Sequence, residues 1–150
     1  MRRRIFAFLI GALLLCTAVL PCAAAQPASS VQQSVIHTEY GDIVVTTTLT
    51  VYDSAARAST KSADKIRTVT YQGQTVATVT LSATFGYDGK SAWVEEASAS
   101  HDTSGGWSYG REVIDTDGST AALSARLTHR DRPYIPVDIS MSCTPSGKIS

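Results

Sequence analysis

Along most of this chain, apolar and polar residues alternate one by one, and residues typical of tight turns interrupt the alternation. The clearest run is VATVTLSATFGYDGKSAWV, at residues 76–94. Because successive side chains of a strand point to opposite faces, such alternation predicts strands with one buried face. Asp88-Gly89 is a strong signal for a two-residue hairpin turn. We therefore expect a β-hairpin here, with the odd-numbered row from Ala77 to Tyr87 as the buried scaffold.

The same pattern predicts about eight strands and no substantial helix. The expected strands are residues 34–40, 43–52, 66–72, 75–87, 90–101, 107–114, 119–130 and 134–143. The stretch 54–65 is rich in alanine and serine but lacks an apolar stripe, so we expect a long connection there. Short strands separated by turns are typical of sandwiches and small barrels. The predicted fold is all-β: an antiparallel, immunoglobulin-like β-sandwich whose strands are joined by hairpins.

The N-terminus has the features of a secretory signal peptide. Basic residues at positions 2–4 precede an apolar run at residues 5–20, and three alanines end at Ala25. This pattern predicts a cleaved signal helix at residues 1–25, with cleavage between Ala25 and Gln26. A retained membrane anchor is an alternative, but the apolar run is shorter than the ~20 residues that a spanning helix needs. A lipid attached at Cys22 is another, although the proline before it suits such a site poorly.

Removing 25 of the 150 residues leaves 125, which suits one domain. We expect a flexible lead at residues 26–33 and a single β-sandwich domain at residues 34–150. Three of the 13 basic residues leave with the signal peptide, so the mature chain has a net charge of −3. Scattered charges of both signs give no strong attraction to nucleic acid or anionic membranes. We expect a secreted, extracellular monomer without a membrane span in the mature chain.

In the last expected hairpin, the apolar pattern determines which side of the two strands is buried. With a three-residue loop at residues 131–133, Leu127 faces Val137 and Ala121 faces Cys143, and every apolar residue of both strands lies on one face. Cys143 is the only cysteine after residue 25, so the mature chain has no intramolecular disulfide. We expect a buried free thiol, with pairing between chains or a reactive thiol as the alternatives.

The hairpin at Asp88-Gly89 needs an irregularity. A two-residue turn places Phe85 opposite Ala92, and the same register would bury Glu96 without a partner. We therefore expect a β-bulge near Glu95-Glu96 that leaves both carboxylates near the surface. The register also leaves Trp93 outside the apolar row.

A third hairpin is expected around a five-residue loop at residues 115–119. This loop would set Val113 opposite Ala121 and would place Trp107 and Tyr109 against the apolar row of the next strand. Burying these three side chains is favourable at ~25 cal/mol per Å² of apolar surface. We expect Trp107 and Tyr109 to be largely buried.

No motif indicates an active site or a metal site. His37, His101 and His129 lack metal-ligand spacing, and we expect them at the surface or at sheet edges. HDTSGGWSYG, at residues 101–110, contains histidine, aspartate and serine, but neighbours on a loop do not form a catalytic triad. We expect no cofactor, no metal and no enzyme activity.

Two acidic segments have simple structural explanations. DTDGS, at residues 115–119, resembles the start of a calcium loop, but the twelfth position is Arg126 instead of glutamate. We favour a hairpin turn there, with a weak calcium site as the alternative. Neighbouring carboxylates such as Glu95-Glu96 point to opposite faces of a strand, so they do not converge as a glycosidase pair must.

Surface recognition is the remaining possibility. Trp93, with Thr84 and Thr80 on the adjoining strand, could form a flat patch for a sugar or a protein. Large exposed aromatic residues are enriched at binding interfaces. The alternative is that Trp93 only covers the edge of the sheet.

The run at residues 76–94 and the C-terminal VDISMSCTPSGKIS together resemble a family of small secreted β-rich proteins of anaerobic Gram-positive bacteria. The shared features are a signal peptide, a T-V-T-L-x-A-T-F-x-Y-x-G hairpin and a C-x-x-x-G-x-x-S end, and they cover roughly the second half of the chain. The resemblance implies no catalytic residue. Members often have a second cysteine just after the hairpin turn, where this chain has Ser91, Ala92 and Trp93.

These observations favour a secreted, non-catalytic binding or cell-envelope-associated module whose partner is a protein or glycan at the cell exterior. A secreted antimicrobial or toxin-like protein is an alternative, but the chain has neither a cationic patch nor an amphipathic helix for membrane attack. A hydrolase with a non-standard site is the other alternative.

Overall fold

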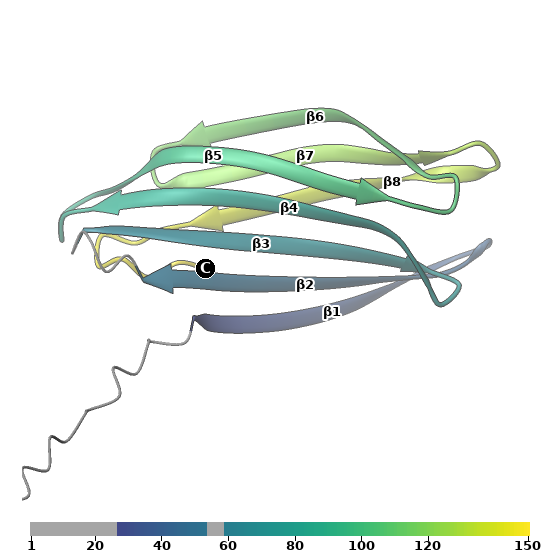
Figure 1. Ribbon diagram of the computed structural model, residues 1–150, viewed down its shortest axis with the longest axis horizontal. Coiled ribbons are helices and arrows are strands. Elements are labelled where there is room, and N and C mark those ends of the chain that lie inside the picture. The colour runs from purple at the N-terminus through teal and green to yellow at the C-terminus, as the bar shows by residue number, and fades with distance from the viewer. Residues whose placement is uncertain (1–26, 54–58) are drawn as a thin grey trace, which may run out of the picture.

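The computed structural model describes residues 27–53 and 59–150, and β-strands are their regular secondary structure (Figure 1). The all-β prediction is confirmed, as is the number of strands. No helix in these two ranges is long and apolar enough to cross a membrane. The strands are β1 (Ala28–Thr38), β2 (Gly41–Asp53), β3 (Thr60–Tyr71), β4 (Gln74–Tyr87), β5 (Ala92–Thr103), β6 (Ser108–Asp117), β7 (Thr120–His129) and β8 (Arg132–Ser142).

The strands form two antiparallel sheets. One has the order β1-β2-β3-β4-β5 and the other has the order β6-β7-β8. Every hydrogen-bonded neighbour is therefore consecutive in the chain, which differs from the immunoglobulin order, where Greek-key connections bring non-consecutive strands together. Hairpin spacing alone predicts which segments are strands but does not distinguish these two orders.

The two sheets share one hydrophobic core. β7 and β8 contact strands of the larger sheet across the layers, and Figure 1 shows the smaller sheet lying along β3 to β5. The predicted odd-numbered row of β4 is buried from Ala77 to Phe85, and the inward rows of β7 and β8 are buried opposite it. The largest fully buried side chains are Phe85, Leu81, Leu123, Leu127, Met141, Val69, Val79 and Val137.

Two strands begin earlier than the sequence predicts. β1 begins at Ala28, so residues 28–33 are strand rather than a flexible lead, and β3 begins at Thr60 within the expected connection at 54–65. β1 is exposed on both faces and so lacks a one-sided apolar row. The inner face of β3 includes Lys65 and Arg67, which interrupt the apolar alternation. The predicted signal peptide at residues 1–25 and residues 54–58 lie outside the described residues.

The β7–β8 hairpin has the predicted faces but not the predicted partners. Leu127 lies opposite Ile135, and Ala121 lies opposite Met141. The turn is Arg130-Asp131 and not a three-residue loop, and the register shifts once more between Leu127 and His129, so the pairing along the rest of the hairpin is two residues away from the predicted one. A shift of two residues returns each side chain to the same face. The buried position of Cys143 is therefore predicted correctly.

The β4–β5 hairpin contains the predicted bulge. Tyr87 lies opposite Ala92 and Phe85 opposite Val94, so the turn has four residues where two were predicted. The Asp88 carboxylate closes this turn by accepting hydrogen bonds from the N–H groups of Ser91 and Lys90, and these bonds lower its pKa. The register then shifts between Thr84 and Phe85, and Glu95 and Glu96 are both exposed as expected.

The β6–β7 hairpin corrects one core assignment. Its turn is Gly118-Ser119, and Ile114 rather than Val113 lies opposite the core residue Leu123. The register shifts between Gly110 and Val113, which leaves Val113 61% exposed. On the other side of this bulge, Trp107 is buried and Tyr109 is half-buried, so the expected burial holds fully only for Trp107.

Candidate functional site

The outer face of the five-stranded sheet, defined here as the even-numbered side of β2, β3 and β4 with its neighbours on β5, is covered by hydroxyl groups. These residues alternate with the buried rows, so the strand period places them on the side away from the core. The cross-strand registers set threonines and serines next to one another over four strands. Its serines and threonines include Thr46, Thr48, Thr50, Ser62, Thr68, Thr70, Thr78, Thr80, Ser82, Thr84, Ser98 and Ser100.

One row of this face contains both aromatic and acidic groups. Tyr52, Ser62, Thr84 and Glu96 lie opposite one another on four consecutive strands, and we call them the Tyr52–Glu96 row. The hydroxyls of Ser62 and Thr84 are hydrogen-bonded at 3.0 Å. Trp93 lies in the next row, opposite Gly86. One aromatic side chain, Tyr52, therefore lies at one end of the row, and the other, Trp93, lies on the strand at its other end, one row away.

The indole of Trp93 lies across the backbone of Gly86. A Cβ atom at Gly86 would be 2.4–2.6 Å from three adjoining ring atoms, Cε2, Cζ2 and Nε1. Gly86 is buried, whereas Trp93 is 41% exposed. One face of the ring thus packs on the sheet, and the remaining surface of the indole is accessible to a ligand.

A shallow hollow lies along the Tyr52–Glu96 row, where Ser62, Thr84 and Glu96 line it. Its volume is about 170 Å³, and its polar lining residues are Ser62, Asp64, Ser82, Thr84, Glu96 and Ser98. It offers two carboxylates and four hydroxyl groups from three adjacent strands. Carboxylates accept charge-assisted hydrogen bonds, which are stronger than neutral ones.

Tyr52 forms the opposite boundary of the row. Its side chain is 43% exposed, and its hydroxyl donates a hydrogen bond of 3.2 Å to Asp64 Oδ2. Partial desolvation, and then the Asp64 carboxylate, raise the pKa of the Tyr52 phenol. The strands of Tyr52 and Trp93 are three spacings apart, about 14 Å. The site is therefore wide enough for an extended ligand.

The structure places the three predicted site residues in two different regions. Trp93 and Thr84 lie in adjacent rows. Thr80 lies six residues from Gly86 along β4, about 20 Å away for an extended strand, and its neighbours are Ile66 and Ser100.

The sequence prediction missed Tyr52, Ser62 and Asp64. Their positions on this face depend on the pairing of β3 with β2 and β4. Residues 54–65 were predicted to be a connection, so Ser62 and Asp64 had no predicted strand neighbours. The one signal for this site in the sequence was Tyr52, which shares a side of its strand with Thr46, Thr48 and Thr50.

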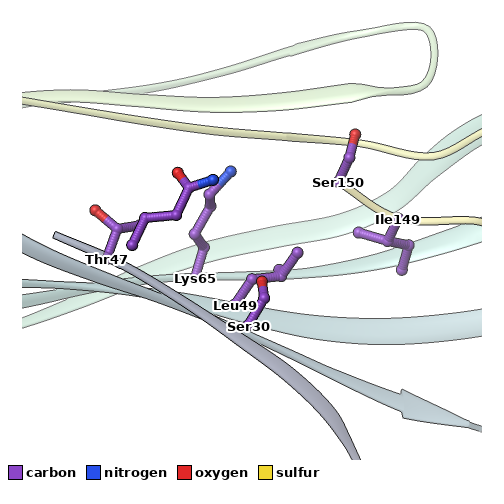
Figure 2. A pocket seen from close by; sticks show the side chains of 7 residues that line it. Ser30, Thr47, Leu49, Lys65, Ile149 and Ser150 are labelled. Atoms are coloured by element: carbon purple, nitrogen blue, oxygen red, sulfur yellow. The ribbon is translucent and has the colours of Figure 1, made fainter.

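A second hollow lies between the inner side of β1 to β3 and the C-terminal segment (Figure 2). Its volume is about 250 Å³, and its lining includes Thr47, Leu49, Lys65 and Ile149. The Lys65 ammonium already donates a hydrogen bond of 2.8 Å to the Ser140 carbonyl. Burial, followed by nearby Arg67, lowers the pKa of Lys65. The charged side chain that lines this hollow is therefore already engaged with β8.

The histidines lie in separate surroundings. The His37 ring nitrogen is 2.7 Å from Asp42, His101 stacks on Tyr109 at 3.9 Å, and His129 contacts Trp107. Within residues 27–53 and 59–150, no three His, Cys, Asp or Glu side chains are grouped closely enough to hold a metal ion. The aspartates of DTDGS lie in β6, and only its Gly-Ser pair forms the turn.

The outer face therefore combines two aromatic surfaces, a hydrogen-bonded pair of hydroxyls and two carboxylates. No protein-family model, curated protein or solved structure matches the chain. The class of ligand is therefore inferred from the side chains of the outer face.

Proposed function

We propose that the protein is a secreted, non-catalytic β-sandwich module that binds an extended glycan at the cell exterior, on the outer face between Tyr52 and Trp93. The observation that carries the proposal is the Trp93 indole, which is supported from below by Gly86 and is open on its other side. An aromatic ring held flat on a sheet offers a large apolar surface without requiring much ordering of the side chain on binding.

The chemistry of a sugar matches this arrangement. A pyranose ring has apolar C–H faces that pack on an aromatic ring, and its rim carries hydroxyl groups. The Asp64 and Glu96 carboxylates accept hydrogen bonds from such hydroxyls, and the Ser62–Thr84 pair both donates and accepts them. The second aromatic residue, Tyr52, favours an oligosaccharide over a single sugar.

The site is already arranged for binding. Its residues are on paired strands, which hold side chains more firmly than loops do. The hydrogen bond from Tyr52 to Asp64 and the packing of Trp93 on Gly86 orient two of the contacting groups. Less conformational freedom is therefore lost when a ligand binds.

The proposal also says that the protein is secreted and that it is not an enzyme. The basic, apolar and small-residue segments at the N-terminus support secretion, as does the resemblance to secreted β-rich proteins. A glycosidase needs two carboxyl groups on opposite sides of the scissile bond. The hollow that Asp64 and Glu96 line is shallow and open, unlike the water-excluding sites in which catalytic groups act, and this supports recognition instead of hydrolysis.

The test is a glycan array and calorimetry with the chain from Gln26 onward, using cell-surface oligosaccharides and peptidoglycan fragments. Trp93→Ala should weaken binding at least tenfold, which corresponds to about 1.4 kcal/mol. Tyr134→Ala is the matched control, because Tyr134 is an exposed aromatic residue on β8 in the other sheet. It should bind like the wild type.

Thr80→Ala supplies a second control on the same face. Because Thr80 lies far along β4 from Trp93, its removal should change the affinity little. If the wild type binds no glycan, or if Trp93→Ala binds as tightly as the wild type, the proposed function is wrong.

A further inference from the structure

The four edge strands of the two sheets differ in how they are protected. β1 and β5 are the edges of the larger sheet, and β6 and β8 are the edges of the smaller one. An edge strand presents unpaired N–H and C=O groups, and proteins usually block it with charges, proline, bulges or a covering segment. The protection of each edge therefore indicates which one is available for pairing.

The edge of β8 is blocked along its length. Pro136 has no N–H group to donate. The Ser140 carbonyl accepts the hydrogen bond from Lys65, and Ser142 forms two backbone hydrogen bonds with Ser150. Little of this edge is left for another strand.

The edges of β5 and β6 are protected by bulges and charges. β5 has the bulge beside Glu95 and Glu96, and its Val94 N–H donates to the Gly118 carbonyl in the turn between β6 and β7. β6 has the irregularity between Gly110 and Val113, together with two acidic residues near its end. Neither edge is flat and neutral.

β1 has none of these features. Its residues, Ala28–Thr38, include no Asp, Glu, Lys, Arg or Pro, and its register with β2 is regular over all eleven residues. In the described part of the chain β1 pairs with β2 alone. It also exposes Val31, Val35 and Ile36, with Val31 at 65%. Figure 1 shows it along the outer margin of the larger sheet.

We propose that β1 is a dimerisation edge, which pairs antiparallel with β1 of a second copy of this chain. The resulting twofold dimer has one continuous ten-stranded sheet. A second copy fits this edge because β1 contains no Asp, Glu, Lys or Arg, so pairing with itself brings no two such like charges together in any register. Because β5, β6 and β8 are each protected, no other edge is left for β1 to pair with head to tail, so the contact closes after two copies.

This inference replaces the expected monomer and does not depend on glycan binding. In the dimer the outer faces of both copies belong to one sheet. The two Trp93 strands are then nine strand spacings apart, about 43 Å. A dimer would thus carry two glycan sites, one on each copy, joined by one continuous sheet, and could bind a repeating surface polymer bivalently.

The test is sedimentation equilibrium on the chain from Gln26 onward, up to ~1 mM, where weak dimers with small interfaces become populated. The wild type should show a monomer–dimer equilibrium. Val31→Lys should raise the dimer dissociation constant about tenfold or more, because each copy brings a charge to the shared edge. The matched control is Val113→Lys, which changes a valine of similar exposure, 61%, on the edge strand β6. It should dimerise like the wild type.

Hydrogen exchange locates the contact independently of any substitution. The amide groups of β1 that face away from β2 should become protected as the concentration of the wild type rises, and those of β6 should not. A wild type that stays monomeric overturns the proposal. So does a dimer that Val31→Lys leaves intact, a dimer that Val113→Lys disrupts equally, or association that continues past two copies.

Discussion

The indole of Trp93 occupies the space that a side chain at Gly86 would need. Three of its ring atoms lie 2.4–2.6 Å from the position of a Gly86 Cβ, and the two residues are opposite each other on β5 and β4. A glycine in the middle of a strand usually weakens it, unless another group packs closely on the bare backbone. Here the tryptophan does so, and the same contact fixes its orientation on the outer face.

Gly86→Ala should therefore destabilise the protein and reduce glycan binding together. The added methyl group displaces the indole, and overpacking of this kind costs about 1–3 kcal/mol. Urea unfolding followed by circular dichroism measures the stability, and the glycan assay measures the binding.

Gly110→Ala is the matched control for this substitution. Gly110 also lies in a strand, but a Cβ there meets no atom within 4 Å. Stability should stay level or rise slightly, because alanine restricts the unfolded chain more than glycine does. Equal effects of the two substitutions would contradict the packing that we describe.

The buried faces of this fold can be predicted from the sequence, because burial acts on every second residue. The rows of β4, β7 and β8 and the bulge at Glu95 all follow from keeping apolar side chains inside and carboxylates outside. The registers are harder to predict, because turn length sets them. The β7–β8 hairpin is displaced by two residues and still buries the same rows.

Elements without a one-sided apolar row could not be found in this way. β1 is exposed on both faces. The inner side of β3 contains Lys65 and Arg67. The long aliphatic stem of Lys65 lets its ammonium reach the Ser140 carbonyl at the edge of β8. The candidate site depends on these strands, since Ser62 and Asp64 lie on β3. Trp93 and Thr84 could be predicted as neighbours, whereas the complete row required the sheet order.

Because of the β6 bulge, alanine substitutions at two adjacent apolar residues should lower the free energy of unfolding by different amounts. Ile114 packs against the core, and Val113 is exposed. Ile114→Ala should cost about 2 kcal/mol or more, and Val113→Ala should cost less than about 0.5 kcal/mol. Urea unfolding of both variants measures these two losses of stability. A larger loss for Val113→Ala than for Ile114→Ala would instead indicate that Val113 lies in the core.

Tyr109 should make stability depend on pH in the alkaline range. Burial, followed by the Glu112 carboxylate that accepts its hydrogen bond at 2.8 Å, raises the pKa of its phenol. The folded state therefore favours the protonated phenol. This contribution is complete below the pKa of an unfolded tyrosine, about 10, and is lost as the pH rises through the folded pKa.

The free energy of unfolding should accordingly fall more steeply above pH ~10 for the wild type than for Tyr109→Phe. Urea unfolding at several pH values measures the difference. Tyr134→Phe, which removes an exposed phenol on β8, should keep the steep decline. If Tyr109→Phe declines as steeply as the wild type, the hydrogen bond to Glu112 does not stabilise the folded state.

Cys143 should react slowly in the folded protein. The residue is 3% exposed and directly follows β8, and its thiol donates a weak hydrogen bond to the Thr144 carbonyl at 3.4 Å. Burial raises the pKa of the thiol, and nearby Lys61 offsets part of this effect. Since the thiolate is the reactive form, both the pKa and the burial slow alkylation.

Iodoacetamide should modify the native protein at least ~100-fold more slowly than the urea-unfolded chain, because reaction requires local opening. Equal rates in the two states, or disulfide-linked dimers on a non-reducing gel, would instead place the thiol at the surface.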